Sequence, residues 1–554
     1  MTGRRSAGPT RVVSGNGRHS DHYRSQGGCS VTAAGLVAAA SGITLDAMYR
    51  RSFRVFADRV AVTTGDPDGP VWTYRELGER AERLAAGLAA TGVGHGDRVA
   101  VLSETRAEFV EIYVALARLG VTAITLNIRW HAEEIAHAVG VAKPVAFITT
   151  ALGTDRAAAV RDRCPSVRHW YCVDSGVDSS GGFESYVDLP ADGAVPTGVA
   201  QPTDVHNVLY TSGTTGLAKG AMITQEAAAV RALRLAQWYT LTPDDGFVGW
   251  LPLFHTGGDE SLNATLLTGG NFCALVTAHA ETMFAAIQRH GLTWTLLLPG
   301  VITDVLHHPR RGEFDLSTLR FVIGYANMMP AVVKELTAAL DVDFNDAFGQ
   351  TETSYVLAHG WSGPGEDPHM RKMPTPLMEV RIVDAQLNET PVGVPGECVV
   401  RGPSMMAGYL DDPEATAEVF AGGWLHTGDV LVRHDDGSLS YVDRAKYLIK
   451  TGGENVYPAE VEQAIAAHPA VQEVCAYGVP DPRWGETVKV VVVRSPGGSV
   501  TGDEVVAWCR ERLAAFKRPH FVEFVDASEL PRSTTGKLQR HLLAERGADE
   551  KERV

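Results

Sequence analysis

The order of apolar and polar residues changes character near residue 44. The first 30 residues show no apolar period, and five arginines and one aspartate lie among Gly, Ser and His. This composition predicts a flexible tail over residues 1–43. From there on, short β-branched runs alternate with segments whose apolar residues recur every three or four positions. Such alternation predicts parallel sheets that are covered by helices.

The clearest helix signal begins at Thr73. Thr73 is followed three positions later by Glu76, which is the form of a capping box, and apolar residues then recur on one helical face up to Leu88. A second helical period covers residues 107–119. Strands are predicted at residues 98–102, 121–126 and 144–148, and the apolar runs 321–324 and 380–383 continue the same alternation.

The last hundred residues have a different pattern. A helix is predicted near residues 461–465, two strands over 471–478 and 488–493, and a helix over 505–515. The polar stretch 433–438 precedes them. The sequence therefore predicts an α/β fold, with a large N-terminal domain of parallel-rich sheets and a small α+β domain at the C-terminus.

Composition narrows the classes of function. The 554 residues are 45% hydrophobic and 21% charged, which is ordinary for a globular protein, and the formal net charge of −16 disfavours nucleic acid as a partner. No apolar run approaches the 18 residues of a membrane span. Seven scattered cysteines form no CxxC pair, and no apolar stretch directly follows Arg4 and Arg5 as an export signal requires. A cytoplasmic protein is expected.

A loop rich in glycine and hydroxyl residues follows the β-run at residue 208. The segment 208–220 reads VLYTSGTTGLAKG, and backbone N–H groups and hydroxyls in such a loop can surround a polyphosphate. It is not a Walker A loop, because Lys219 is followed by Gly220 rather than by Ser or Thr. A Gly/Ser/Thr-rich surface turn is the alternative interpretation.

The ordered string over 211–220 resembles the hallmark loop of the adenylate-forming superfamily, which includes acyl-CoA and aryl-CoA synthetases. Further segments resemble the family's motifs in the family's order; these are residues 252–258, 347–352, 424–429, 443–458 and 531–537. The resemblance spans roughly residues 45–545. It implies a tail over 1–43, a large domain over 44–442, a hinge over 443–447, a small mobile domain over 448–546 and a tail over 547–554.

The resemblance implies chemistry in which ATP and Mg²⁺ activate an acid as an acyl-adenylate, followed by transfer to coenzyme A. The predicted ATP and AMP contacts are Thr211, Ser212, Gly213, Thr214, Thr215, Gly216, Lys219, Asn345, Asp346, Ala347, Phe348, Gly349, Gln350, Asp429, Tyr441 and Arg444. A carboxylate such as Asp429 is a natural acceptor for both ribose hydroxyls.

Catalytic roles follow from the same resemblance. Lys537 is expected to bridge the α-phosphate and the acid, Thr351 to contact the α-phosphate, and Glu352 to bind magnesium, while His255 lies beside the acyl carboxylate. Lys446 is the predicted hinge residue. The residues expected on the coenzyme A side are Lys450, Gly452, Gly453 and Glu454.

Two segments depart from the family pattern. Where relatives commonly have Gly-Gly-Ala-Pro, this chain has Gly324, Tyr325, Ala326 and Asn327, so we expect a shortened and more polar acyl pocket. After His255 the family usually continues with apolar residues, whereas this chain has Asp259 and Glu260. Two acids in a pocket wall must be paired, hydrated or used to recognise a substrate. The alternative is that the helix turns both of them to solvent.

The leading hypothesis is therefore an acid:CoA ligase for a small aromatic or short polar carboxylic acid. One alternative keeps the adenylate but changes the acceptor to a carrier protein or an amine, or the acid to nitrite in a diazotization. A non-catalytic nucleotide-binding homologue is the other alternative, and the presence of Lys219, Glu352, Asp429, Arg444 and Lys537 argues against it. The expected partners are the acid, ATP and coenzyme A, and a homodimer is left open.

Overall fold

The computed structural model describes residues 43–174, 182–189, 195, 199–211, 218–325, 330–358, 360–368, 370–452, 454–532, 538–547 and 553. The side chains of Pro299, Gly300 and Tyr325 are not described. The predicted N-terminal tail lies outside the described residues, apart from Ile43. The boundaries proposed for the two domains stay predictions.

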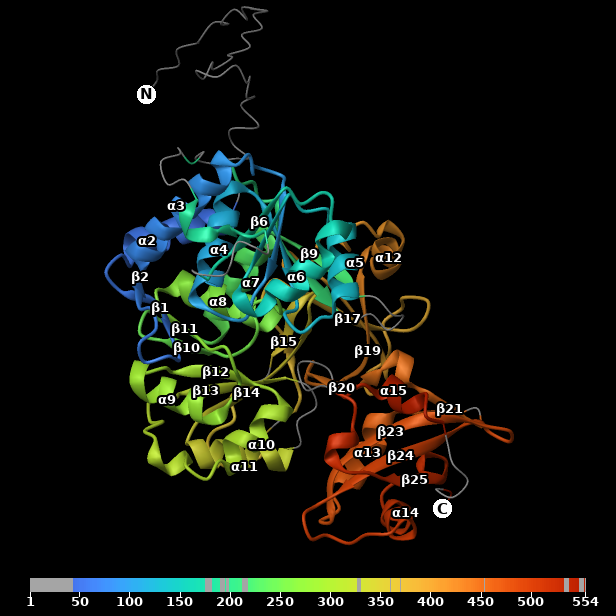
Figure 1. Ribbon diagram of the computed structural model, residues 1–554. Helices are drawn as coiled ribbons and strands as arrows, with labels where there is room; N and C mark the ends of the chain where they lie inside the picture. The colour runs from blue at the N-terminus through green and yellow to red at the C-terminus, as the bar shows by residue number, and fades with distance from the viewer. Residues whose placement is uncertain are drawn as a thin grey trace, which may run out of the picture. The chain divides into compact units, whose positions relative to one another are not determined.

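A seven-stranded sheet has β8 and β9, the strands that flank the predicted phosphate loop in the sequence, at one end of its order (Figure 1). Its order is β7-β6-β5-β3-β4-β8-β9, and every pair is parallel except β8 with β9. The strands are β3 (Arg98–Leu102), β4 (Thr122–Leu126), β5 (Ala146–Thr149), β6 (His169–Cys172), β7 (Glu184–Ser185), β8 (Val205–Thr211) and β9 (Lys219–Thr224). The central strands are buried on both faces, which explains their continuous apolar runs.

A nine-stranded sheet has the order β16-β15-β14-β13-β12-β10-β11-β1-β2. Its strands are β1 (Val60–Thr64), β2 (Trp72–Thr73), β10 (Gly246–Gly249), β11 (Asn271–Ala274), β12 (Trp294–Leu297), β13 (Phe321–Tyr325), β14 (Asp343–Gln350), β15 (Ser354–Ala358) and β16 (Met373–Pro374). Strands β1 and β10 to β14 are parallel, and β15 turns back antiparallel on β14.

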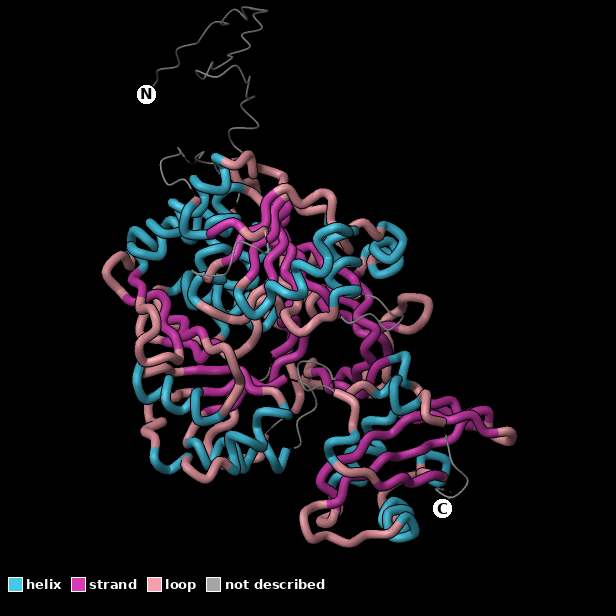
Figure 2. The backbone as a smooth tube through the Cα atoms, in the orientation of Figure 1, coloured by secondary structure: helices cyan, strands magenta, loops and turns pink. Residues whose placement is uncertain are grey.

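The described helices agree with the predicted alternation, and Figure 2 shows strands running between them. They are α2 (Leu45–Val55), α3 (Tyr74–Ala90), α4 (Ala107–Leu119), α5 (Ala132–Ala142), α6 (Thr154–Val160), α7 (Gln225–Trp238), α8 (Thr256–Thr268), α9 (Ala280–His290), α10 (Pro299–His307), α11 (Pro330–Leu340) and α12 (Pro413–Val419). The capping box of Thr73 and Glu76 is present at the start of α3. None of the described helices combines the length and hydrophobicity that a bilayer crossing needs.

A four-stranded antiparallel sheet corrects one prediction. It consists of β17 (Glu379–Val383), β18 (Gly396–Arg401), β19 (Leu425–Arg433) and β20 (Leu439–Arg444). The run 380–383 therefore does not continue the parallel sheets. Its strand, β17, pairs antiparallel with β18, and antiparallel strands can be joined by short turns instead of helical crossovers. The polar stretch 433–438, expected to precede the C-terminal unit, spans the end of β19 and the turn that joins it to β20.

The C-terminal residues form a five-stranded mixed sheet with three helices. Its elements are β21 (Ile449–Thr451), β22 (Glu454–Val456), β23 (Val471–Asp481), β24 (Gly485–Arg494), β25 (Phe521–Phe524), α13 (Pro458–Ala466), α14 (Gly502–Arg510) and α15 (Arg540–Ala544). Helix α14 ends at Arg510 rather than at the predicted residue 515, because the next backbone N–H groups turn back to the Cys509 carbonyl.

Candidate active site

His255 occupies the position just before helix α8. Its backbone is extended, and its N–H group donates to the Pro252 carbonyl oxygen at 3.0 Å. The segment turns so tightly that a Cβ on Gly258 would lie 2.3 Å from that same oxygen, which requires glycine there. Burial lowers the pKa of His255 to about 4, and Arg129 adds to the effect. The imidazole is therefore neutral at pH 7, and its Nε2 has no hydrogen-bond partner among the described residues.

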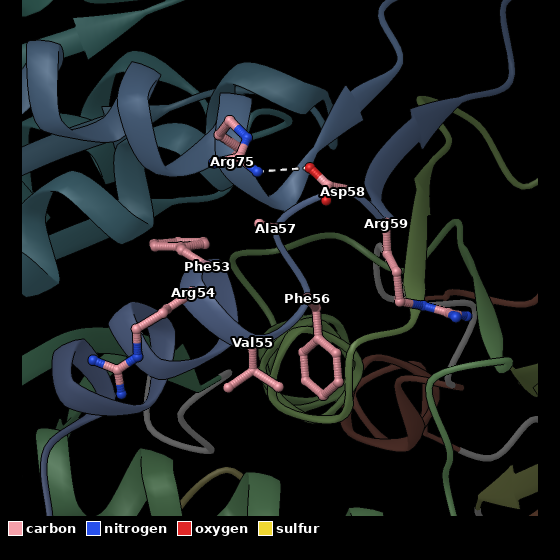
Figure 3. A pocket seen from close by; sticks show the side chains of 8 residues that line it. All are labelled: Phe53, Arg54, Val55, Phe56, Ala57, Asp58, Arg59 and Arg75. Atoms are coloured by element: carbon pink, nitrogen blue, oxygen red, sulfur yellow. Dashed lines mark hydrogen bonds and ion pairs between the residues drawn. The ribbon is translucent and has the colours of Figure 1, made fainter.

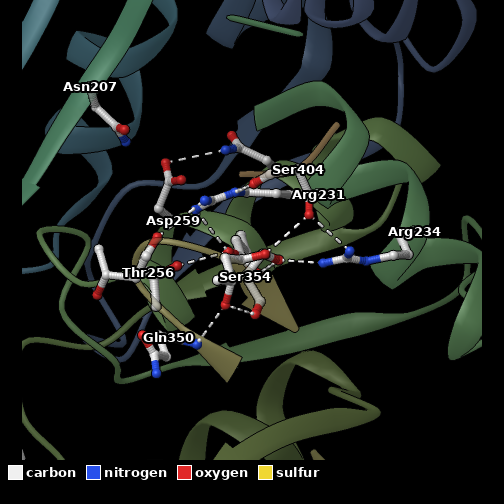
Figure 4. A network of polar contacts seen from close by, with 12 residues as sticks. Asn207, Arg231, Arg234, Thr256, Asp259, Gln350, Ser354 and Ser404 are labelled. Atoms are coloured by element: carbon white, nitrogen blue, oxygen red, sulfur yellow. Dashed lines mark hydrogen bonds and ion pairs between the residues drawn. The ribbon is translucent and has the colours of Figure 1, made fainter. Parts of the chain in front are cut away.

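The two acids that follow in α8 are both buried, which rules out the interpretation that the helix turns them to solvent. Glu260 is held by Arg231 at 3.2 Å, by the Thr256 hydroxyl at 2.7 Å and by the Ser354 hydroxyl at 2.8 Å (Figure 4). Its carboxylate is thus committed to partners within the protein. Burial raises the pKa of Glu260, and the arginines Arg231 and Arg234 oppose that shift.

Asp259 has a different environment. Its Oδ1 accepts a hydrogen bond from Asn263 at 3.2 Å and lies 3.8 Å from Nε2 of His206. Its Oδ2 has no hydrogen-bond partner among the described residues, and the same holds for both ring nitrogens of His206. This side of α8 therefore retains hydrogen-bonding capacity that water or a substrate could use.

The hairpin between β14 and β15 carries Thr351 and Glu352 in its turn. Gly349 permits the close return of the chain, since a Cβ there would lie 2.0 Å from the Ser354 carbonyl oxygen. The Glu352 side chain accepts a hydrogen bond from the Tyr409 hydroxyl at 2.9 Å. The carboxylate is half-buried, and it is the type of oxygen ligand that Mg²⁺ prefers.

Gln350, the last residue of β14, joins this hairpin to β19 and β20. Its Nε2 donates to the Thr427 carbonyl oxygen and to Oδ2 of Asp429, both at 2.6 Å. Nε of Arg444 lies 2.9 Å from Oδ1 of Asp429. Asp429 thus contacts both Gln350 and Arg444, so predicted nucleotide residues of β14, β19 and β20 meet at this carboxylate.

The other predicted nucleotide residues of β14 contact several different neighbouring elements. Asn345 accepts from the Tyr239 hydroxyl at 3.2 Å, and Asp346 forms a buried ion pair with Lys372. Phe348 and Tyr441 pack with their ring centres 6.0 Å apart. Ala347 continues the strand and pairs with Tyr325, while Asp346 pairs with Gly324, so the predicted floor of the acyl pocket adjoins the nucleotide strand.

The described ends of the phosphate loop are Thr211 and Lys219, which face each other across β8 and β9. The Lys219 ammonium lies 5.3 Å from the centre of the Tyr409 ring and 3.9 Å from Asp412. Tyr409 therefore contacts both Lys219 and Glu352. The predicted residues outside the described part of the chain are Ser212, Gly213, Thr214, Thr215, Gly216, Ala326, Asn327, Gly453 and Lys537.

The remaining predicted residues lie at and beyond the hinge. Lys446 belongs to a short 3-10 turn, with its ammonium 4.8 Å from the centre of the Tyr447 ring. Lys450 and Glu454 are exposed on the hairpin of β21 and β22. Gly452 sits between them with φ +59°, a conformation that favours glycine.

A surface pocket elsewhere contains none of these residues. It has a volume of about 480 Å³ and is lined by residues 53–59 and Arg75, at the end of α2 (Figure 3). Arg75 forms an exposed ion pair with Asp58 at 2.6 Å. Several of the predicted motif residues lie instead around the 351–353 turn and Asp429, and the assignment of their roles stays a prediction.

Comparison with known proteins decides the family. The sequence profile of the AMP-binding enzymes matches residues 49–410, and the profile of their C-terminal domain matches residues 460–537. The chain belongs to the AMP-binding enzyme family. The predicted membership of the adenylate-forming superfamily, of the acid:CoA ligase type, is confirmed, and so is the fold class.

Relatives of this AMP-binding enzyme match almost its whole length. It is 35% identical over 522 residues to the 3-(7a-methyl-1,5-dioxo-octahydro-1H-inden-4-yl)propanoyl:CoA ligase of Rhodococcus jostii, covering 91% of this chain and 98% of that protein. It is 34% identical over 476 residues to the feruloyl-CoA synthase of an Amycolatopsis species, covering 85% and 93%. The crystal structure of ATP-bound MatB from Rhodopseudomonas palustris superposes with a TM-score of 0.80 at 30% identity, covering 91% and 99%.

Sequence reasoning missed several residues that support this site. Arg231, Arg234, Ser354 and Ser404 form a buried network beneath it, and Tyr409 links Lys219 to Glu352. The available signal was the pair of arginines three positions apart in the otherwise alanine-rich and leucine-rich helix α7, which is normally interpreted as a solvated stripe.

Proposed function

We propose that this protein converts a small aromatic or short polar carboxylic acid that carries a hydrogen-bond donor into its coenzyme A thioester. The observation that carries the proposal is the meeting of Gln350, Asp429 and Arg444 beside the turn of Thr351 and Glu352. His255 lies just before helix α8, and Asp259, with an unsatisfied oxygen, lies in its first turn. The name of one relative, the feruloyl-CoA synthase, specifies an aromatic acid and supports the aromatic part of this substrate class.

The proposed reaction has two steps, adenylation of the acid and formation of the thioester. A carboxylate oxygen of the acid attacks the α-phosphorus of ATP, an O–P bond forms, and the bond to pyrophosphate breaks. The thiol of coenzyme A then loses its proton and attacks the acyl carbon, and AMP leaves with the oxygen that came from the acid. Both steps bring anionic groups together, so cationic and hydrogen-bonding groups must stabilise the developing charge.

In this scheme Lys219 and Thr211 bind the outer phosphates, Thr351 the α-phosphate and Asp429 the ribose. The carboxylate of Glu352 fits Mg²⁺ bound with ATP, and that ion would neutralise phosphate charge. Lys537 stabilises the charge that develops as the α-phosphorus is attacked. Rotation about Lys446 then brings Lys450, Gly452 and Glu454 to the site for coenzyme A.

Asp259 defines the acid in this proposal. A buried carboxylate oxygen without a partner is costly, and a hydroxyl or amino group on the acid would satisfy it. Glu260 cannot serve in the same way, because Arg231, Thr256 and Ser354 already occupy its oxygens. The hydrocarbon analogue of the native acid should therefore be a poor substrate.

The test is a pyrophosphate-release screen across carboxylic acids and nitrite, with coenzyme A, with an amine or with no acceptor. We expect acid-dependent pyrophosphate and a thioester with a small hydroxylated or aminated acid. Lys537→Ala should lower adenylation 10²- to 10³-fold and leave thioester formation from preformed acyl-adenylate nearly unchanged. Better turnover of dodecanoate, or product only with nitrite or an amine, would overturn the proposed substrate or acceptor.

A further inference from the structure

We infer that Arg231 is a positioning residue that holds the turn of Thr351 and Glu352 and couples it to the start of helix α8. The inference deepens the proposed function and rests on it, because it assigns a purpose to the support of residues that are proposed to bind the α-phosphate and magnesium. Arg231 comes from the middle of α7 and is 1% exposed.

The guanidinium of Arg231 reaches three separate segments. Its Nε donates to the Ser404 carbonyl oxygen at 2.8 Å, its Nη1 to Glu260 at 3.2 Å, and its Nη2 to the Thr351 carbonyl oxygen at 3.1 Å (Figure 4). The planar guanidinium of arginine carries N–H groups that point in several fixed directions, so it can donate to all three segments at once. The single ammonium group of lysine cannot reproduce this arrangement.

Every carbonyl oxygen of the 351–353 turn is held from outside the hairpin. Thr351 accepts from Arg231, Glu352 from the Met406 N–H group at 2.8 Å, and Thr353 from the Ser404 hydroxyl at 3.0 Å. Of these three donors, Arg231 alone is charged. Such a turn is fixed before substrate binds, which is the arrangement that transition-state stabilisation requires.

The residue that closes the turn is strained, and the same network holds it. Ser354 has φ +64°, a left-handed conformation that non-glycine residues rarely adopt. Its hydroxyl donates to Glu260 at 2.8 Å and accepts from Arg234 at 2.6 Å. The strain persists because several buried partners determine the position of Ser354 together.

Glu260 extends the support to the acid site. It lies in the first turns of α8 and accepts a hydrogen bond from Thr256, the residue directly after His255. Arg231 thus connects, through one carboxylate, the segment proposed for the acid with the turn proposed for the nucleotide. A displacement of Arg231 would change the relative position of the two reacting groups.

Arg234 provides a matched control within the same helix. It is 4% exposed and donates to the Ser354 and Ser404 hydroxyls, and no contact with the 351–353 turn's carbonyl oxygens is seen among its described hydrogen bonds. Arg231→Lys and Arg234→Lys therefore make the same chemical change at similar burial. The two variants differ in whether the hydrogen bonds of the arginine to Glu260 and to the Thr351 carbonyl oxygen are removed.

The experiment compares both variants with the full-length wild-type chain in pyrophosphate release, thermal unfolding and the stabilisation produced by Mg·ATP. We expect both to unfold at lower temperature. Arg231→Lys alone should lower kcat at least tenfold, with KM for the acid within threefold, and should reduce the Mg·ATP stabilisation. Equal effects of the two variants on kcat, or a kcat of Arg231→Lys within threefold of wild type, would overturn the inference.

A triple variant covers the case in which Arg231→Lys does not fold. Replacing all members of a buried ionic group by apolar residues is often neutral for stability, so Arg231→Met and Arg234→Met combined with Glu260→Leu, which leave no uncompensated charge of this group, should fold. We expect it to remain slow, whereas recovery of the wild-type kcat would show a purely structural role. If wild type releases no acid-dependent pyrophosphate, the proposed function fails, and the Mg·ATP stabilisation of the variants still decides the role of Arg231.

Discussion

Helix α8 presents two adjacent acids to two unlike surroundings. On one side, the oxygens of Glu260 are occupied by Arg231, Thr256 and Ser354. On the other, Asp259 has one contact with Asn263, a longer approach to His206 and an oxygen without a partner among the described residues. The comparison shows that burial alone does not give an acid its role. The number of donors around it separates a structural acid from one that can receive a ligand.

The largest expected contrast is in stability. Glu260→Gln removes the charge that compensates two buried arginines, so it should lower the free energy of unfolding by about 3 kcal/mol. Asp259→Asn can keep the contact with Asn263 and should cost less than about 1 kcal/mol. Urea unfolding of the two amide variants measures the difference. Equal losses would mean that the two sides of α8 are equivalent.

The next effect is the pH dependence of stability that His255, the residue just before α8, should cause. Because the folded-state pKa of His255 is lowered to about 4, the unfolded chain binds the proton more readily, and stability falls as pH drops from about 6.5 towards 4. Between pH 7 and pH 5 the free energy of unfolding should fall by no more than about 2 kcal/mol. The contact of the ring with solvent makes the expected loss smaller than this upper bound.

His255→Gln tests this dependence on acid pH. Since glutamine does not titrate, the variant should show a flatter curve of unfolding free energy against pH in that window. Unfolding measured at several pH values from 7 to 5 gives both curves. Parallel curves for wild type and variant would show that other groups cause the acid sensitivity.

The smallest expected effect is on substrate selection. If the free oxygen of Asp259 receives a donor from the acid, Asp259→Asn should lower kcat/KM for that acid at least tenfold, which is about 1.4 kcal/mol. The variant should discriminate less against the analogue that lacks the donor. Steady-state kinetics with the pair of acids checks this. An unchanged ratio of kcat/KM values would move the substrate contact away from Asp259.

Much of the fold, and the family, could be predicted from the sequence. The capping box at Thr73 and the apolar runs of β3, α4 and β13 are local patterns, and the structure places elements there. The motifs named the residues that converge around Asp429. The run 380–383 was assigned to the wrong kind of sheet, because a short apolar strand does not reveal the direction of its neighbours.

The support of the site was not predictable in the same way. Arg231 contacts Glu260, 29 positions away, and Thr351, 120 positions away, so its burial depends on segments that only the fold brings together. Asp259 and Glu260 are neighbours of similar chemistry in the sequence. Their difference arises from the arginines on one side of α8 and from His206 on the other.

The central claim is that the acid reacts through an acyl-adenylate, and isotope transfer tests it most directly. The protein is incubated with Mg·ATP, coenzyme A and the acid found in the screen, with both carboxylate oxygens labelled with ¹⁸O. Mass spectrometry then determines the label in the nucleotide product. The account predicts AMP that contains one ¹⁸O atom per thioester formed, together with unlabelled pyrophosphate. ADP with labelled inorganic phosphate would contradict it, because the acid would then have attacked the γ-phosphorus.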